Sequence, residues 1–167
     1  MSCMRMTVTV LVVAALAVGS CGGSGDDGPT RADFIAKTDA RCKVSNARTK
    51  ALNAEVSRVA DTAPTEARLL RGLAPILERA FRQVRDNATA FRAVTAPSAD
   101  AAEVGRIRAL YDEQAAVVGK LSQAAKNNDL KQYRTLFEEQ KDVLVRLRKA
   151  TGAYGLKECG STKSDAA

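Results

Sequence analysis

Apolar residues recur at helical spacing along every long segment of this 167-residue chain, and no segment alternates as a β-strand does. Positions spaced alternately three and four residues apart are mostly apolar within residues 70–94, 104–125 and 130–154. The first such segment, residues 31–61, is weaker, because the first half of its series is mostly small and hydroxylated. The spacing predicts an all-α fold.

Four helices can be bounded by signals at their ends. The first helix is predicted to begin after Thr30, which has capping-box spacing. The third and fourth begin after Asp100 and Asp129, which have N-cap spacing. Pro64, a favoured first-turn residue, begins the second, and Gly155 closes the fourth in a left-handed conformation. Because short connections between long helices force antiparallel neighbours, the predicted fold is an antiparallel up-down-up-down four-helix bundle.

A polar layer is expected inside this bundle. For straight helices of equal rise, one height is shared by Ser45, Ala80, Gln114 and Gln140. Asn87 and Thr38 follow nearly two turns beyond. Toward the opposite end, the layers that contain Leu52 and Val56 should form a dry, well-packed core.

Buried amides and hydroxyls are costly unless they are hydrogen-bonded. The layer that includes Ser45, Gln114, Gln140 and Asn87 therefore has two interpretations. It could control helix register by penalising slipped pairings, or it could be a small polar cavity that holds water or a ligand.

Cys42 and Cys159 are predicted to form a disulfide, because an even pair in an exported chain is typical of one. The chain has no histidine and no Cys-x-x-Cys motif, so no metal or cofactor site is expected. Without histidine, a general base would have to be a buried carboxylate or lysine, and none falls on a heptad position. We therefore expect no enzymatic activity.

Five arginines share one face of the second helix, opposite its apolar series. They are Arg68, Arg71, Arg79, Arg82 and Arg85. An ordinary solvated face explains them, and the functional alternative is adhesion to anionic lipids or envelope polymers. Nucleic acid is not an expected partner, because the seven aromatic residues (Phe 4, Tyr 3, Trp 0) mostly occupy heptad positions.

The N-terminus has the pattern of an export signal, in which Arg5 precedes a largely apolar stretch over residues 7–19. Such a stretch spans about 20 Å as a helix, less than the roughly 30 Å of a bilayer core. The motif Val18-Gly19-Ser20-Cys21 resembles the lipobox of bacterial lipoproteins. That resemblance implies cleavage before Cys21, a diacylglycerol and palmitate-type acyl chains on it, and a cell membrane location on the extracytoplasmic face. A soluble secreted form is the alternative.

The mature part also has a weaker resemblance. The segments Asp39-Ala40-Arg41-Cys42 and Gly155-Leu156-Lys157-Glu158-Cys159 are similar to small helical lipoproteins of high-GC bacteria, and this similarity transfers no functional residue. The expected organisation is a signal peptide over residues 1–20, a Gly/Ser/Asp-rich tether over 21–30, a bundle over 31–160 and a disordered tail over 161–167.

Two functions remain open for this chain. One is a lipid-anchored structural or interaction module of the cell envelope, which would contact an envelope protein, lipid or polymer. The other is a small-ligand-binding lipoprotein that uses the polar layer. A cavity at that layer would favour the second function, and filled layers would favour the first.

Overall fold

The computed structural model describes residues 28–159. The predicted signal peptide, Cys21 and the predicted tail over residues 161–167 lie outside the described residues.

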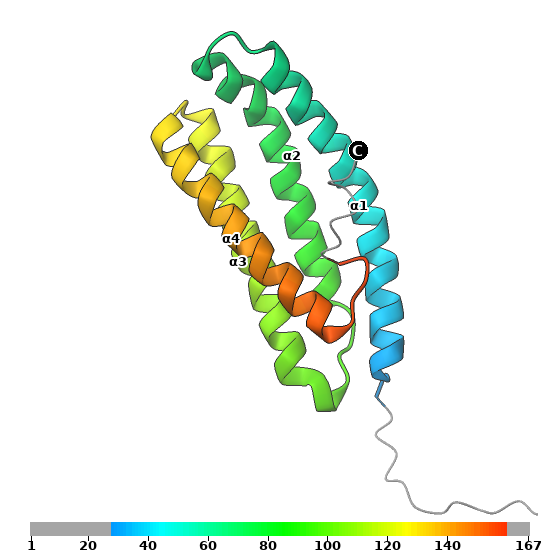
Figure 1. Cartoon of the computed structure of the whole chain (residues 1–167). Helices are drawn as coiled ribbons and strands as arrows, with labels where there is room; N and C mark the ends of the chain where they lie inside the picture. The colour runs from blue at the N-terminus through cyan, green and yellow to red at the C-terminus, as the bar shows by residue number, and fades with distance from the viewer. Residues whose placement is uncertain (1–27, 160–167) are drawn as a thin grey trace, which may run out of the picture.

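Four α-helices and one 3₁₀ turn make up the fold (Figure 1). The prediction of an all-α four-helix fold is confirmed. The elements are α1 (Arg31–Thr62), α2 (Glu66–Arg92), η1 (Ser98–Asp100), α3 (Ala101–Lys126) and α4 (Leu130–Tyr154).

Contacts at one end of the molecule show how the helices are directed. The guanidinium of Arg31, at the start of α1, donates to the carbonyl of Tyr154 at the end of α4 at 3.0 Å and lies 3.6 Å from the Asp100 carboxylate before α3. Phe34 packs edge-on against Phe91 near the end of α2, with ring centroids 5.8 Å apart. The start of α1 therefore meets the ends of α2 and α4, as Figure 1 also shows.

Three predicted helix ends have the expected chemistry. Thr30 and Asp33 form a complete capping box, Asp129 accepts a hydrogen bond from the Gln132 amide at 2.9 Å, and Gly155 has φ of 100°. The caps at Thr30 and Asp129 pair amide groups that the first turn of a helix would otherwise leave unpaired, and the amide of Gly155 donates to carbonyls of the last turn of α4.

Two helix starts differ from the prediction. α2 begins at Glu66 and not at Pro64, because the Thr65 hydroxyl accepts from the Arg68 amide and caps the helix there. The Asp100 carboxylate does not cap α3, because it accepts from the Tyr154 hydroxyl at 2.8 Å instead. A sequence pattern cannot distinguish a cap from a tertiary hydrogen bond.

The helices pack around the bundle unequally. α2 packs extensively against α3, α3 packs against α4, and α1 packs against α2, whereas α1 and α4 make almost no close contact. Gly72 allows a close approach of α1 to α2, since a Cβ at this position would lie 2.6 Å from Cγ1 of Val59. The bundle therefore lacks close packing on its fourth side, between α1 and α4.

A C-terminal strap, residues 155–159, crosses this open side from α4 to α1 (Figure 1). The Asp39 carboxylate on α1 accepts the amides of Lys157 and Glu158 at 3.0 and 2.9 Å. The Sγ atoms of Cys42 and Cys159 lie 2.02 Å apart, at disulfide distance. The strap thus holds α1 and α4 together at one level while the rest of that side stays open.

Candidate functional site: a cavity between α1 and α4

A cavity of about 440 Å³ lies on the open side of the bundle. All four helices and Cys159 of the strap line it, and on α1 the lining runs from Thr38 to Val56. That separation corresponds to about 27 Å of helix. The cavity is therefore long and narrow and runs parallel to the helices.

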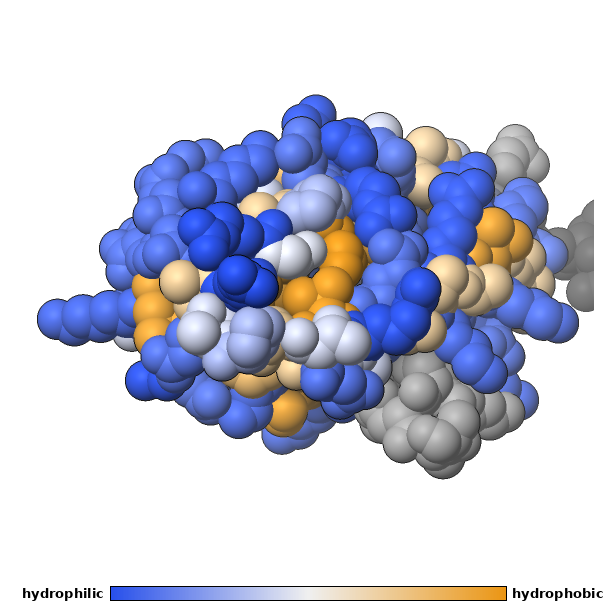
Figure 2. All heavy atoms as spheres, turned by 90° about the horizontal axis from the view of Figure 1, so that it is seen from above, coloured by the Kyte–Doolittle hydropathy of each residue, from blue (hydrophilic) through white to orange (hydrophobic). Residues whose placement is uncertain are grey.

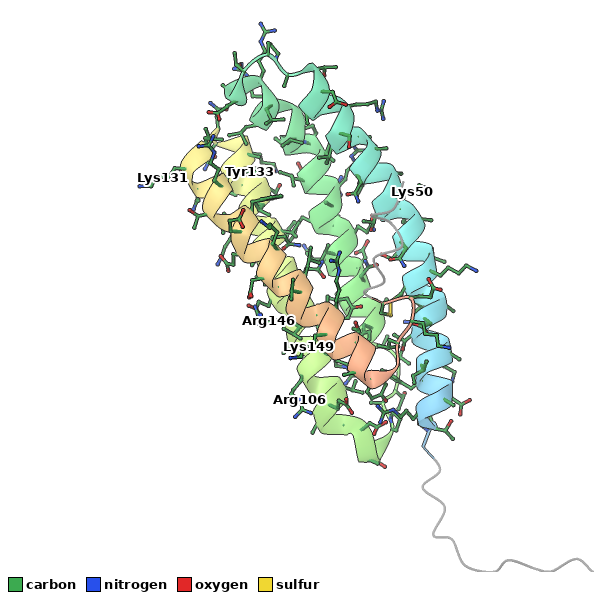
Figure 3. The ribbon with its side chains drawn as sticks, in the orientation of Figure 1. Lys50, Arg106, Lys131, Tyr133, Arg146 and Lys149 are labelled. Atoms are coloured by element: carbon green, nitrogen blue, oxygen red, sulfur yellow. A yellow bond between two sulfur atoms is a disulfide. The ribbon has the colours of Figure 1, made fainter. Side chains whose placement is uncertain are left out.

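Most of the cavity wall is apolar. Its apolar lining comes mainly from α2, α3 and α4 and includes Leu73, Ile76, Val118, Leu121, Leu144 and Leu147. At the rim, Phe137 is 47% exposed, which is high for a side chain of that size. Figure 3 shows Tyr133 on the side of α4 that faces the bundle, whereas Lys131 points outward.

Hydrophobic residues are also visible at the end of the molecule that carries the α1–α2 and α3–α4 connections. Figure 2 views this end, where they lie in the middle of the surface and hydrophilic residues surround them. Apolar side chains are therefore exposed to solvent at this end of the molecule.

The wall formed by α1 and α2 carries a cluster of polar side chains that are hydrogen-bonded to one another. The Gln83 amide donates to the Thr49 hydroxyl at 2.9 Å and to the Ser45 carbonyl at 3.1 Å. The Asn87 amide donates to the Ser45 hydroxyl at 2.6 Å. Because these side chains satisfy one another, they hold α1 against α2 at little desolvation cost.

Two other polar atoms of the lining have no such partner. The Thr38 hydroxyl and Oε1 of Gln140 are buried and make no hydrogen bond to any described residue. Thr38 is only 1% exposed. A buried unsatisfied polar atom costs about 1–3 kcal/mol, so these two atoms identify places where water or a ligand would be stabilised.

The two tyrosines of the lining are neutral hydrogen-bond donors at physiological pH. Burial, with a smaller contribution from the charge of Asp39, raises the pKa of Tyr111 to about 12. Burial also raises the pKa of Tyr133. Both hydroxyls therefore keep their protons in neutral solution.

Every residue of the predicted polar layer lines the cavity, but at heights that differ from the prediction. Ser45, Gln114, Gln140 and Asn87 are all in the lining. Asn87 contacts Ser45 directly and does not lie nearly two turns beyond it. The connection from α1 to α2 extends over residues 63–65, so a count that starts α2 at Pro64 shifts the register of the two helices.

The expectation of a dry, filled core at the opposite end is also wrong in part. Leu73 and Leu121 are buried there, but Leu52 and Val56 of α1 are only partly buried, and the cavity reaches all four. α1 and α4 lie farther apart toward this end (Figure 1), which a count along straight helices cannot anticipate.

Several cavity residues do not appear among the predicted site residues. Gln83 and Arg148 lie one position away from the apolar series of their helices, so a strict heptad count omits them. Arg41 is likewise adjacent to Cys42. A wider stripe of about 100° around each helix would have included residues of this kind.

The arginine face of α2 is partly engaged in ion pairs. Arg79 forms a salt bridge with Glu55 of α1, and Arg82 lies 3.2 Å from Glu78. Hydrogen bonds from Arg79 and from Lys126 hold the pKa values of Glu55 and Glu78 below their usual range. These contacts favour a solvated, ion-paired face over a free anion-binding surface, and adhesion through Arg68, Arg71 and Arg85 stays a prediction.

Residues 28–159 contain no group of three or more His, Cys, Asp or Glu side chains that could hold a metal ion. No helix within that range is both long enough and apolar enough to cross a membrane. No protein-family model matches this chain, and neither curated proteins nor solved structures show significant similarity to it.

Proposed function

We propose that this protein binds an elongated, largely apolar small molecule in the cavity between α1 and α4. The observation that carries this proposal is an apolar cavity of about 440 Å³ that includes two buried, unpartnered polar atoms. An engineered apolar cavity of about 150 Å³ takes up benzene, so the volume here is roughly three times what a small apolar ligand needs. The protein acts in this proposal as a binding protein and performs no catalysis.

The membrane anchor belongs to the same proposal. Lipidation at Cys21, which rests on the resemblance of Val18-Gly19-Ser20-Cys21 to a lipobox, would hold the cavity near the outer face of a cell membrane. Lipids and other apolar molecules would be concentrated there. Release of the Cys21→Ser variant from the membrane fraction would support the anchor, and unchanged membrane association would contradict it.

Nile red, an uncharged dye that fluoresces in apolar surroundings, tests the binding function. Ala80 lines the cavity, so Ala80→Leu should fill part of it, maintain or raise the melting temperature and weaken dye binding at least fivefold. Val84→Phe is a second filling variant on the same helix. The matched control is Ala116→Leu, because Ala116 is exposed on α3 and lies outside the cavity lining.

Saturable dye binding by the wild type and the Ala116→Leu control, with loss in both filling variants, would support the proposal. A wild-type protein that binds no dye, or folded filling variants that bind as well as the wild type, would contradict it.

A second candidate is the interaction module of the cell envelope. Val44, Phe137 and Val145 are large apolar side chains that are 57%, 47% and 61% exposed, and two of them lie on α4. Exposed apolar residues of this kind are common at protein interfaces. Crosslinking of the anchored protein in its native envelope would identify a partner, and crosslinks absent from these faces would count against this candidate.

A further inference from the structure

The charges along the cavity are all of one sign. Among the described residues that line it, the charged side chains are Arg41 and Arg148, and none is aspartate or glutamate. A cationic ligand would therefore meet no countercharge in the cavity, whereas an anionic group would meet two guanidinium groups.

Both arginines lie toward the strap. Arg41 is adjacent to Cys42, whose sulfur lies at disulfide distance from that of Cys159. Arg148 is adjacent to Leu147, which belongs to the same packed cluster as Tyr111 and Cys159. The two positive charges therefore flank the level at which the strap crosses the open side of the bundle.

The environment of Arg41 leaves room for an anion. Nη1 of Arg41 donates to the carbonyl of Ala90, which uses one of five guanidinium N–H donors. The nearby Asp39 carboxylate accepts two strap amides with its two oxygens. The Tyr111 hydroxyl lies 3.8 Å from the Cys42 sulfur and supplies a neutral donor at this level.

The opposite end of the cavity is apolar. Leu52, Val56, Leu73 and Leu121 line it, together with Tyr133, and the polar side chain here is the exposed Asn53. A volume of about 440 Å³ spread over about 27 Å gives a mean cross-section of about 16 Å². Since nonbonded carbon atoms pack about 4 Å apart, a space this narrow suits an extended hydrocarbon chain.

From this polarity we infer that the cavity binds a single-chain anionic amphiphile of the long-chain carboxylate type. Its head group lies between Arg41 and Arg148 beneath the strap, and its tail runs past Gln140 toward Leu52 and Val56. This inference rests on the proposed binding function and adds the chemical class and the orientation of the ligand.

Displacement of Nile red by dodecanoate and by dodecanol tests the inference on the full chain. The two ligands share a tail length and differ in head-group charge. A hydrogen bond to a charged group contributes about 1.5–3 kcal/mol, so dodecanoate should bind at least tenfold more tightly than dodecanol. The double variant Arg41→Gln/Arg148→Gln should remove that preference and leave dodecanol binding within about twofold of the wild type.

The control is Arg106→Gln/Lys149→Gln, which removes the same charge at two exposed positions outside the cavity lining (Figure 3). It should preserve the preference for dodecanoate. Equal binding of the two ligands by the wild type, or an unchanged preference in the cavity variant, would overturn the inference while the proposed function stands. A protein that binds neither Nile red nor dodecanol fails the proposed function instead.

Discussion

Removal of the buried Thr38 hydroxyl tests most directly whether the cavity keeps a polar group for a ligand at some cost in stability. Thr38 is 1% exposed, and its Oγ1 makes no hydrogen bond to any described residue. Thr38→Val replaces this hydroxyl with a methyl group of similar size. It removes the desolvation penalty of an unsatisfied polar atom, which is about 1–3 kcal/mol.

The matched control is Thr151→Val. Thr151 is also 1% exposed on a helix, but its hydroxyl donates to the Leu147 carbonyl at 2.9 Å. Loss of a satisfied hydrogen bond should cost about 1 kcal/mol. The two substitutions are chemically identical and should therefore change the free energy of unfolding in opposite directions.

Thermal unfolding followed by circular dichroism measures both effects. For roughly 130 ordered residues, a change of about 1 kcal/mol in the free energy of unfolding shifts the melting temperature by about 4 °C. Thr38→Val should therefore raise the melting temperature by about 4–11 °C, and Thr151→Val should lower it by about 4 °C. Equal destabilisation by both variants would refute the reasoning, because it would mean that the Thr38 hydroxyl is already satisfied in solution.

Four further predictions follow from other parts of the structure. Replacing Cys42 and Cys159 by alanine should cost about 5 kcal/mol in chain entropy, given their separation of 117 residues, and chemical denaturation should show no loss if the pair is not bonded. Gly72→Ala should destabilise the protein despite its gain in helix propensity, because the new Cβ would lie 2.6 Å from Val59, whereas Gly105→Ala, with no atom within 4 Å, should stabilise it by about 0.5–1 kcal/mol. Burial raises the folded-state pKa of Tyr111 from 10.0 to about 12, so the neutral phenol contributes about 3 kcal/mol to the free energy of unfolding below pH 10, and this contribution is lost as the pH rises to about 12. Tyr111→Phe should lessen this loss of stability at alkaline pH. Arginine and lysine contacts lower the pKa values of Glu55, Glu78 and Glu113, so these ionised carboxylates stabilise the fold above the unfolded-state pKa of 4.5, and that stabilisation is lost as the pH falls below it. Because the chain has no histidine, the melting temperature should not change between about pH 6 and 8.

The sequence predicted those features of the fold that depend on local chemistry. Helical periodicity and caps at Thr30, Asp129 and Gly155 depend on neighbouring residues, so they can be read along the chain. Asp100 was not predictable in this way, because its partners Arg31 and Tyr154 come from distant helices.

The candidate site was predicted in composition but not in geometry. The polar residues of the first half of α1 indicated a region that could not pack as a dry core. Which residues meet there depends on the register of α1 against α2 and on the separation of α1 from α4. Both depend on packing, as at Gly72 against Val59, and neither follows from a residue count.

The arrangement of stabilising contacts explains how such a bundle can keep a cavity. A bundle with apolar residues along α1 would close that helix onto α4, because burial contributes about 25 cal/mol per Å² of apolar surface. Here the middle of α1 presents Ser45 and Thr49, which bond to α2 and offer α4 little apolar surface. The strap then fastens α1 to α4 near one level, through Asp39 and the sulfur of Cys42. Together these contacts hold the two helices close enough to form a wall on each side of the cavity and far enough apart to leave it open.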